Sequence, residues 1–300
     1  MSMSIAFHDT YVHPLPENHK FPMDKYELLH MQLLYEGIAD KGDFFQPSLI
    51  ETKDVYKIHT KEYIEKLFDL KLTPREQRVS GFQHTLELIE RERRIMGGTK
   101  ECASSVLNGG IALNIAGGTH HAYTNRAEGF CLLNDQAIAA QWLLDETHID
   151  SVLIVDLDVH QGNGTAEIFA NNDRVYTFSM HGKGNYPLKK ELSDLDISLE
   201  DGTDDKQYLQ VLENSLDQIV SEFTPEFIFF QCGVDVLATD KLGRLSLSRN
   251  GCKERDRIVL GRAKELNLPI VCTMGGGYSE KIKDIVEAHA NTFRLAKEIF

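Results

Sequence analysis

The chain has 300 residues, of which 42% are hydrophobic and 26% are charged, a composition typical of a globular protein. Its formal net charge of −14 argues against direct binding to a nucleic-acid backbone, and it suits either solubility or a cationic partner. The five cysteines form no C-x-x-C pair, and we expect no signal peptide and no membrane span, which predicts a cytoplasmic protein. Nothing in the sequence specifies an oligomeric state.

Short runs rich in Val, Ile and Phe alternate with helical patterns along the chain. The predicted strands are residues 5–8, 111–116, 152–158, 174–180, 227–231 and 270–274. The predicted helices are residues 24–39, 61–70, 81–94, 99–108, 135–146, 164–170, 205–222, 249–266 and 278–299, and 191–205 is expected to be a long surface loop. This alternation predicts a single α/β domain over residues 1–300, with a central, mostly parallel β-sheet and helices on both faces.

Polar motifs follow five of these strands. Ligands in open α/β sheets bind beyond the carboxyl ends of the strands, so these motifs are expected to converge on one pocket. They are His120-His121, the stretch from Asp156 to Asn163, the stretch from Ser179 to His181, Asp235, and Tyr278.

A metal site is predicted at the end of the strand 152–158. Side chains alternate along a strand, so Asp156, Asp158 and His160 are expected on one side, where buried carboxylates require a cation. Asp158 and His160, joined by Asp235 from another strand end, make a three-ligand site of the catalytic zinc type. The oxygen-rich set also suits Fe²⁺, Mn²⁺ or Co²⁺. The alternative is that Asp158 and His160 form a satisfied buried ion pair.

His120-His121 and Tyr278 are candidate catalytic groups. Metal-assisted hydrolysis needs a base for the proton of water and an acid for the leaving group, and two imidazoles oriented by Asp156 and Asn163 can share these tasks. Tyr278 follows three glycines and can donate a hydrogen bond to an oxyanion. The alternatives are a polar pair without function for the histidines, and a packing residue that opens the C-terminal helix for Tyr278.

These motifs resemble the zinc-dependent histone deacetylase family of the arginase/deacetylase fold. The resemblance runs in order through residues 117–122, 129–135, 156–165 and 275–278. The amino-acid sequences of residues 160–164 and 243–248 are most similar to those of class IV members and bacterial histone-deacetylase-like amidohydrolases. It implies that Asp158, His160 and Asp235 are zinc ligands. It also implies roles for His120 and His121 as the catalytic pair, for Asp156 as the partner of His120, and for Tyr278 as the oxyanion donor.

The resemblance implies further sites. Gly129, Phe130 and Gly276 match substrate-binding positions of an acyl-lysine tunnel, and residues 181–186 are expected to form another wall. A structural K⁺ or Na⁺ is expected at a set of groups that comprises Asp156, Asp158, His160, Ser179 and Met180.

Two departures from the family pattern stand out. Asn163 replaces an aspartate that many members carry, and an uncharged amide should raise the pKa of His121 less. Residues 72–94 contain no match to the rim aspartate with which some members hold the substrate backbone.

The expected activity is hydrolytic removal of acetyl or longer fatty acyl groups from the ε-amino group of lysine in a protein or peptide. The alternatives are an acetylpolyamine amidohydrolase, or another small-molecule amide deacetylase, and a non-catalytic acyl-lysine-binding protein. A two-metal ureohydrolase of the arginase type is disfavoured because position 237, two residues after Asp235, is Leu rather than Asp.

Overall fold

A central sheet of eight strands organises the computed structural model, which describes residues 3–300. The strand order is β2-β1-β3-β8-β7-β4-β5-β6, and every neighbouring pair is parallel. The strands are β1 Ser4–Ala6, β2 Phe44–Phe45, β3 Ile111–Asn114, β4 Val152–Asp156, β5 Val175–Gly182, β6 Leu195–Leu199, β7 Phe227–Gln231 and β8 Ile270–Thr273. The α/β prediction is confirmed, and the described sheet is parallel throughout rather than mostly parallel.

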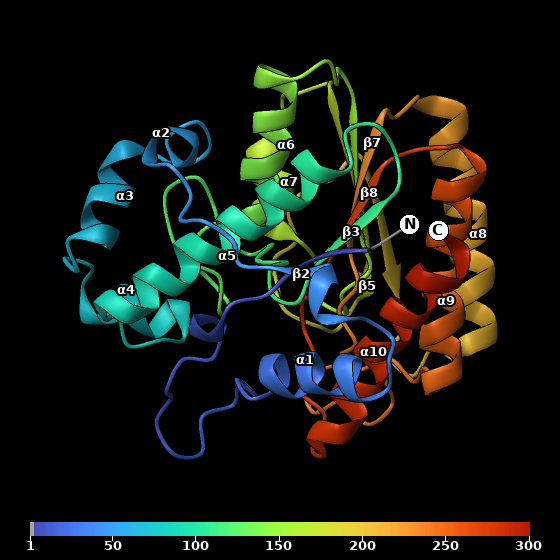
Figure 1. The fold of residues 1–300 in the computed structure, drawn as a ribbon, viewed down its shortest axis with the longest axis horizontal. Coiled ribbons are helices and arrows are strands. Elements are labelled where there is room, and N and C mark those ends of the chain that lie inside the picture. The colour runs from blue at the N-terminus through green and yellow to red at the C-terminus, as the bar shows by residue number, and fades with distance from the viewer. Residues whose placement is uncertain (1–2) are drawn as a thin grey trace.

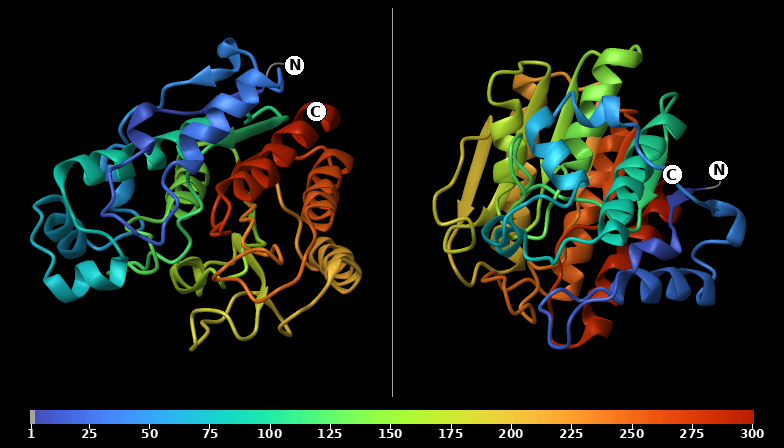
Figure 2. Two further views of the ribbon diagram at one scale, coloured as in Figure 1. Left: turned by 90° about the horizontal axis from the view of Figure 1, so that it is seen from below. Right: turned by 90° about the vertical axis from the view of Figure 1, so that its left-hand side faces the viewer.

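Helices cover both faces of the sheet (Figures 1 and 2). One face carries α5 Leu86–Ser105, α6 Asp135–Glu146 and α7 Asn163–Phe169, and the other carries α8 Asp205–Glu222, α9 Arg249–Glu265 and α10 Ile282–Ile299. α1 Lys25–Tyr35 packs against α10. The short helices α2 Thr52–Val55, α3 Lys61–Phe68 and α4 Pro74–Ser80 form a lobe beyond α5, and two 3₁₀ helices span Asp9–Tyr11 and Lys41–Asp43.

Two of the predicted helices form one continuous helix. The Gly97-Gly98 pair interrupts the sequence pattern between 81–94 and 99–108, but α5 runs through it from Leu86 to Ser105. A Cβ at Gly97 would lie 1.9 Å from the carbonyl oxygen of Ser48, and a Cβ at Gly98 would lie 2.5 Å from the hydroxyl of Tyr11. The glycines therefore serve close packing against neighbouring segments.

Two other expectations were wrong in part. The predicted surface loop 191–205 contains the edge strand β6, which pairs with β5 but is only half-buried, so it lacks the apolar run of a central strand. The last helix begins at Ile282 rather than at 278, which leaves Tyr278 in the preceding loop.

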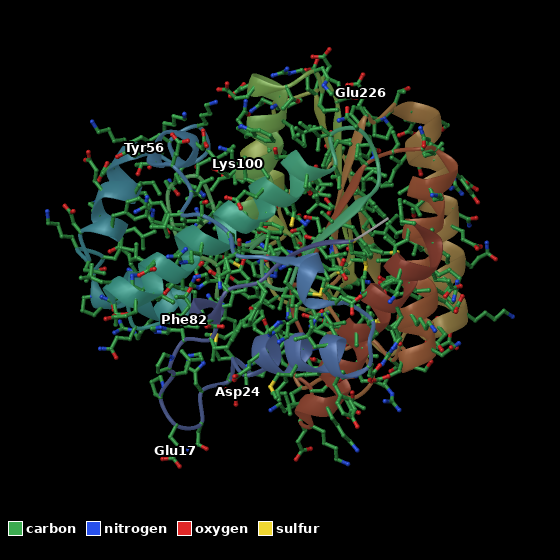
Figure 3. The ribbon with its side chains drawn as sticks, in the orientation of Figure 1. Glu17, Asp24, Tyr56, Phe82, Lys100 and Glu226 are labelled. Carbon is green, nitrogen blue, oxygen red and sulfur yellow. The ribbon has the colours of Figure 1, made fainter. Side chains whose placement is uncertain are left out.

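Because all strands of the sheet are parallel, their carboxyl ends lie at the same end of the sheet. β4 and β7 lie side by side near the middle and are fully buried. The N-terminal loop with Glu17 and Asp24 lies toward the carboxyl ends of the strands, whereas Glu226, just before β7, lies at the opposite end of the molecule (Figure 3). Among residues 3–300, no helix has the length and apolar character required to cross a bilayer.

Candidate metal centre and active site

Asp158, His160 and Asp235 converge where β4 and β7 end. All three are buried, and each offers a ligand atom within 4.8 Å of the others. Nδ1 of His160 lies 3.0 Å from Oδ1 of Asp158 and 3.1 Å from Oδ2 of Asp235. The two segments that carry these residues are 75 positions apart, and the adjacency of β4 and β7 brings them together.

The buried ionisable groups of this cluster strongly perturb one another's pKa values. Burial, together with the negative charge of Asp158, raises the pKa of Asp235 to about 7. Burial alone would lower the pKa of His160, but hydrogen bonds to Asp158 and Asp235 raise it to about 10. Two buried carboxylates thus share one imidazole, and an oxygen–nitrogen–oxygen donor set of this kind fits a divalent metal ion.

Backbone and side-chain contacts hold the two ligand-bearing loops. The amide of Val159 donates to Oδ1 of Asp235 over 2.9 Å, and the amide of Gly276 donates to Oδ2 of Asp158 over 2.8 Å. A Cβ at Gly276 would lie 2.0 Å from Oδ2 of Asp235, so Gly276, an expected substrate-binding residue, lies directly against the carboxylates. The guanidinium of the buried Arg255 donates to three carbonyls of the same loops, those of Leu157, Cys232 and Gly233.

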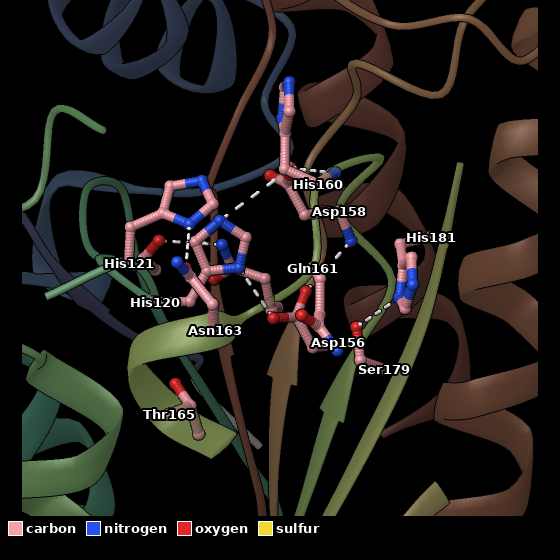
Figure 4. A network of polar contacts seen from close by, with 12 residues as sticks. His120, His121, Asp156, Asp158, His160, Gln161, Asn163, Thr165, Ser179 and His181 are labelled. Carbon is pink, nitrogen blue, oxygen red and sulfur yellow. Dashed lines mark hydrogen bonds and ion pairs between the residues drawn. The ribbon is translucent and has the colours of Figure 1, made fainter. Parts of the chain in front are cut away.

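The paired histidines differ in their partners and in their charge. Nδ1 of His120 lies 2.6 Å from Oδ2 of Asp156, and Nδ1 of His121 lies 2.6 Å from Oδ1 of Asn163 (Figure 4). Burial opposes protonation of His120, but Asp156 and Asp158 raise its pKa to about 9. Burial lowers the pKa of His121 well below its ordinary value, and the positive charges of His120 and His160 lower it further. One imidazole is therefore charged and its neighbour is neutral.

Asp156 does not join the metal-binding group. β4 ends at Asp156, so strand alternation no longer governs the side chains that follow. Its Oδ2 accepts from His120 and its Oδ1 accepts from the amide of Asp158 over 3.1 Å. The predicted common side for Asp156, Asp158 and His160 therefore holds only for the last two.

Tyr278 lies in the loop between β8 and α10, beside the metal-binding group. Burial raises the pKa of its phenol well above the ordinary value, so the hydroxyl stays protonated and can donate. Its backbone amide donates to Oδ2 of Asp240 over 2.6 Å. The loop is also held by Lys25, whose Nζ donates to the carbonyl of Gly275 over 2.7 Å and lies 5.9 Å from the Tyr278 ring centroid.

A hollow of about 400 Å³ opens above His121 and His160. Gly129 and Phe130 form one wall with φ of 54° and 66°, and their amides donate to the carbonyls of Val79 and Ser80 at the end of α4. A smaller cavity of about 40 Å³ lies deeper, beside Asp158 and Gly276. The remaining lining residues of the outer hollow are Val79, Gly184, Asn185, Tyr186, Leu188, Leu242, Arg244 and Tyr278.

The segment that lines the hollow begins later in the sequence than the expected wall at 181–186. Residues 184–186 and Leu188 line the hollow, whereas His181 is buried between Ser179, 2.9 Å from its Nδ1, and Ser198, 3.2 Å from its Nε2. Ser179 pairs with Asp156 in the register of β5 and β4, and Met180 follows it in β5. These positions lie where the monovalent cation is expected, and that site remains a prediction.

Several residues of this region are not indicated by the sequence motifs. Lys25, Val79 and Glu128 lack a glycine-rich or strand-end context, and α4 was not predicted as a helix. Thr73 and Glu76 form a capping box, and Pro74 occupies the first position of the helix. This sequence pattern is typical of a helix start and could have predicted α4. The burial of Lys25 could not be anticipated, because lysine is almost always exposed.

Comparison with known proteins identifies the family and the fold. The family model described as Histone deacetylase domain matches residues 19–293. An uncharacterized protein of Picosynechococcus sp. is 39% identical over the whole of both chains. Histone deacetylase clr6 of Schizosaccharomyces pombe is 33% identical over 87% of this chain and 68% of its own. A crystal structure of an HDAC homolog from Aquifex aeolicus superposes with a TM-score of 0.87 at 23% identity, covering 99% of this chain and 84% of that one, and supports the fold.

Proposed function

The chain belongs to the histone deacetylase family, and on that premise we propose that it is a metal-dependent amidohydrolase that removes acetyl or longer acyl groups from the ε-amino group of lysine. The observation that carries the proposal is the convergence of three potential metal ligands, a pair of histidines with different charge, and a protonated tyrosine below one open hollow. The combination is what amide hydrolysis requires.

Asp158, His160 and Asp235 would hold the metal ion, for which Zn²⁺ is the first candidate and Fe²⁺, Mn²⁺ and Co²⁺ are alternatives. When bound, such an ion polarises the amide carbonyl and lowers the pKa of a water molecule. The proposed K⁺ or Na⁺ would lie behind this site, near Asp156 and Ser179.

The chain's own groups would move the protons. Neutral His121 accepts a proton from the attacking water at Nε2, because its Nδ1 faces Asn163. Charged His120 stays paired with Asp156 and stabilises negative charge nearby. Tyr278 donates a hydrogen bond to the oxyanion, and a protonated histidine donates to the leaving amine, which gives free lysine and a carboxylate.

The mouth of the hollow supports acyl-lysine over acylpolyamine. Apart from its histidines, the charged side chain that lines it within residues 3–300 is Arg244, and Val79, Leu188 and Leu242 are apolar. A polyamine carries further ammonium groups, and none of the lining residues offers them a carboxylate. The net charge of −14 attracts cations in general and does not separate the two substrates.

Two finer points complete the proposal. The amino-acid sequences of residues 160–164 and 243–248 support class IV as the branch of the family. Five buried cysteines without disulfides support the cytoplasm, a reducing compartment, as its location.

A substrate panel tests the function. Purified protein would be assayed on peptides with lysine acyl groups from acetyl to myristoyl and on acetylpolyamines, with metal content measured on the same sample. Lysine-peptide turnover that rises with metal content supports the proposal. Turnover confined to acetylpolyamines would favour the alternative enzyme, and fully loaded protein without activity on any substrate would favour an acyl-lysine-binding protein.

A further inference from the structure

Asn163 presents an orientation problem that an aspartate at the same position would not have. A carboxylate offers oxygen at both ends, whereas an amide accepts at Oδ1 and donates at Nδ2. Here Oδ1 faces Nδ1 of His121 over 2.6 Å. If the amide turned over, Nδ2 would face His121 instead, Nδ1 would have to accept, and the ring proton would move to Nε2.

The far end of Asn163 lies against two oxygen atoms. Nδ2 donates to the hydroxyl of Tyr123 over 3.0 Å and to Oε1 of Glu128 over 3.0 Å. The Tyr123 hydroxyl can accept or donate, and it also donates to Glu191 over 3.1 Å, so it does not by itself fix the amide. An ionised carboxylate only accepts, so Glu128 permits one orientation of the amide and opposes the other.

Glu128 is itself well anchored. It directly precedes the wall residues Gly129 and Phe130, and its side chain is 14% exposed. Nε of Arg126 lies 3.1 Å from its Oε2, and the hydroxyl of Tyr186 donates to its Oε1. The Tyr186 ring in turn stands edge-on to His121, with centroids 5.2 Å apart. Glu128 thus links the wall of the hollow to the partner of His121.

We propose that Glu128 is a positioning residue that acts through Asn163. Its carboxylate holds the amide so that Oδ1 faces His121, which keeps the ring proton on Nδ1 and leaves Nε2 free to accept a proton. The pairing supplies, through an amide, the orientation that a carboxylate at position 163 would give directly. The role in turnover rests on the proposed amidohydrolase function, whereas the tautomer of His121 can be measured without it.

Paired substitutions distinguish this role from simple packing. In Glu128→Gln, the group that faces Nδ2 of Asn163 can be an acceptor or a donor, so it no longer fixes the orientation of the Asn163 amide. We therefore expect kcat to fall about 10-fold with little change in KM. Asn163→Asp alone places two carboxylates together and should also be impaired. In the double variant, the carboxylate introduced at position 163 orients His121 unaided, so Glu128→Gln should raise kcat over Asn163→Asp alone.

Controls and a second readout keep the test decisive. Glu200→Gln, at an exposed residue paired with Lys183 over 2.6 Å, is the matched control and should leave kcat unchanged. Histidine ¹⁵N NMR of the metal-loaded protein should report His121 protonated at Nδ1, and a population protonated at Nε2 in Glu128→Gln. Equal losses of kcat from Glu128→Gln in both backgrounds, or an unchanged His121 tautomer, would overturn the proposal. Inactive wild-type protein that still shows the tautomer shift would count against the amidohydrolase and in favour of Glu128.

Discussion

At the residue scale, two adjacent histidines differ in charge: despite its burial, His120 is kept protonated by Asp156 and Asp158, whereas burial and the neighbouring positive charges lower the pKa of His121. His120 faces a carboxylate and His121 faces an amide, at the same distance of 2.6 Å. The smaller rise in pKa that we expect from Asn163 than from an aspartate stays a prediction, because the pKa of His121 is lowered first by burial. The roles of acid and base remain predictions that substitution can test.

Tyr278→Phe is expected to keep the metal and lose most turnover. The phenol stays protonated and lies beside the metal-binding group, so its removal takes away one oxyanion donor, and kcat should fall on the order of 10²–10³-fold. Turnover and metal content would be measured together. Tyr56→Phe, at an exposed tyrosine at the end of α2, is the matched control (Figure 3). Near-normal turnover of Tyr278→Phe would remove this hydroxyl from the mechanism.

Asp158→Asn is expected to lose the metal. The substitution removes one of two buried carboxylates in the donor set and leaves an amide, a weaker ligand, next to His160. Metal content after dialysis would fall well below that of wild type. Full occupancy in the variant would refute the ligand assignment.

At the scale of elements, strand ends could be predicted from the sequence and long-range contacts could not. Asp158, His160 and Asp235 follow buried apolar runs, and the rule for parallel sheets was enough to place them together. Lys25 and Val79 reach the site from α1 and α4, whose packing depends on tertiary contacts that no local pattern records. The break predicted between 94 and 99 is absent because Gly97 and Gly98 allow close packing of α5 against Ser48 and Tyr11, which lie in distant segments.

His59 ties the segment between α2 and α3 to the start of α6. Its Nδ1 faces the carbonyl of Tyr123 over 2.9 Å, and its Nε2 accepts from the amide of Asn134 over 3.0 Å. Burial lowers its pKa from 6.5 to about 4. Between these values the unfolded chain binds the proton and the folded chain does not, so stability is lost as pH falls from 6.5 toward 4.

His59→Gln should reduce that acid sensitivity. Gln can make both hydrogen bonds without titrating, so the free energy of unfolding should fall less steeply with acid, by up to about 1.4 kcal/mol per pH unit. Urea unfolding between pH 7 and pH 4.5, with chelator in all samples to exclude metal effects, measures this slope. Parallel curves for wild type and variant would contradict the assigned pKa.

At the scale of the whole molecule, metal binding is expected to stabilise the fold. The ion would neutralise carboxylates carried by two strand ends at the centre of the sheet, and it binds the folded chain only where these ends meet. At a free metal concentration 1,000-fold above Kd, the gain is about 4 kcal/mol. Thermal unfolding with zinc and with chelator should therefore differ in Tm, and Asp158→Asn should show no such difference. An equal Tm for wild type under both conditions would argue against a metal at this site.

Titration of metal-free protein with zinc is the most direct test of the central claim, that one metal site built from Asp158, His160 and Asp235 serves a lysine deacylase. Hydrolysis of an ε-acyl-lysine peptide is predicted to be absent in the metal-free protein, to rise linearly with added zinc, and to stop rising at one equivalent per chain. Full activity without metal, or no hydrolysis of any acyl-lysine peptide at one bound equivalent, would contradict it.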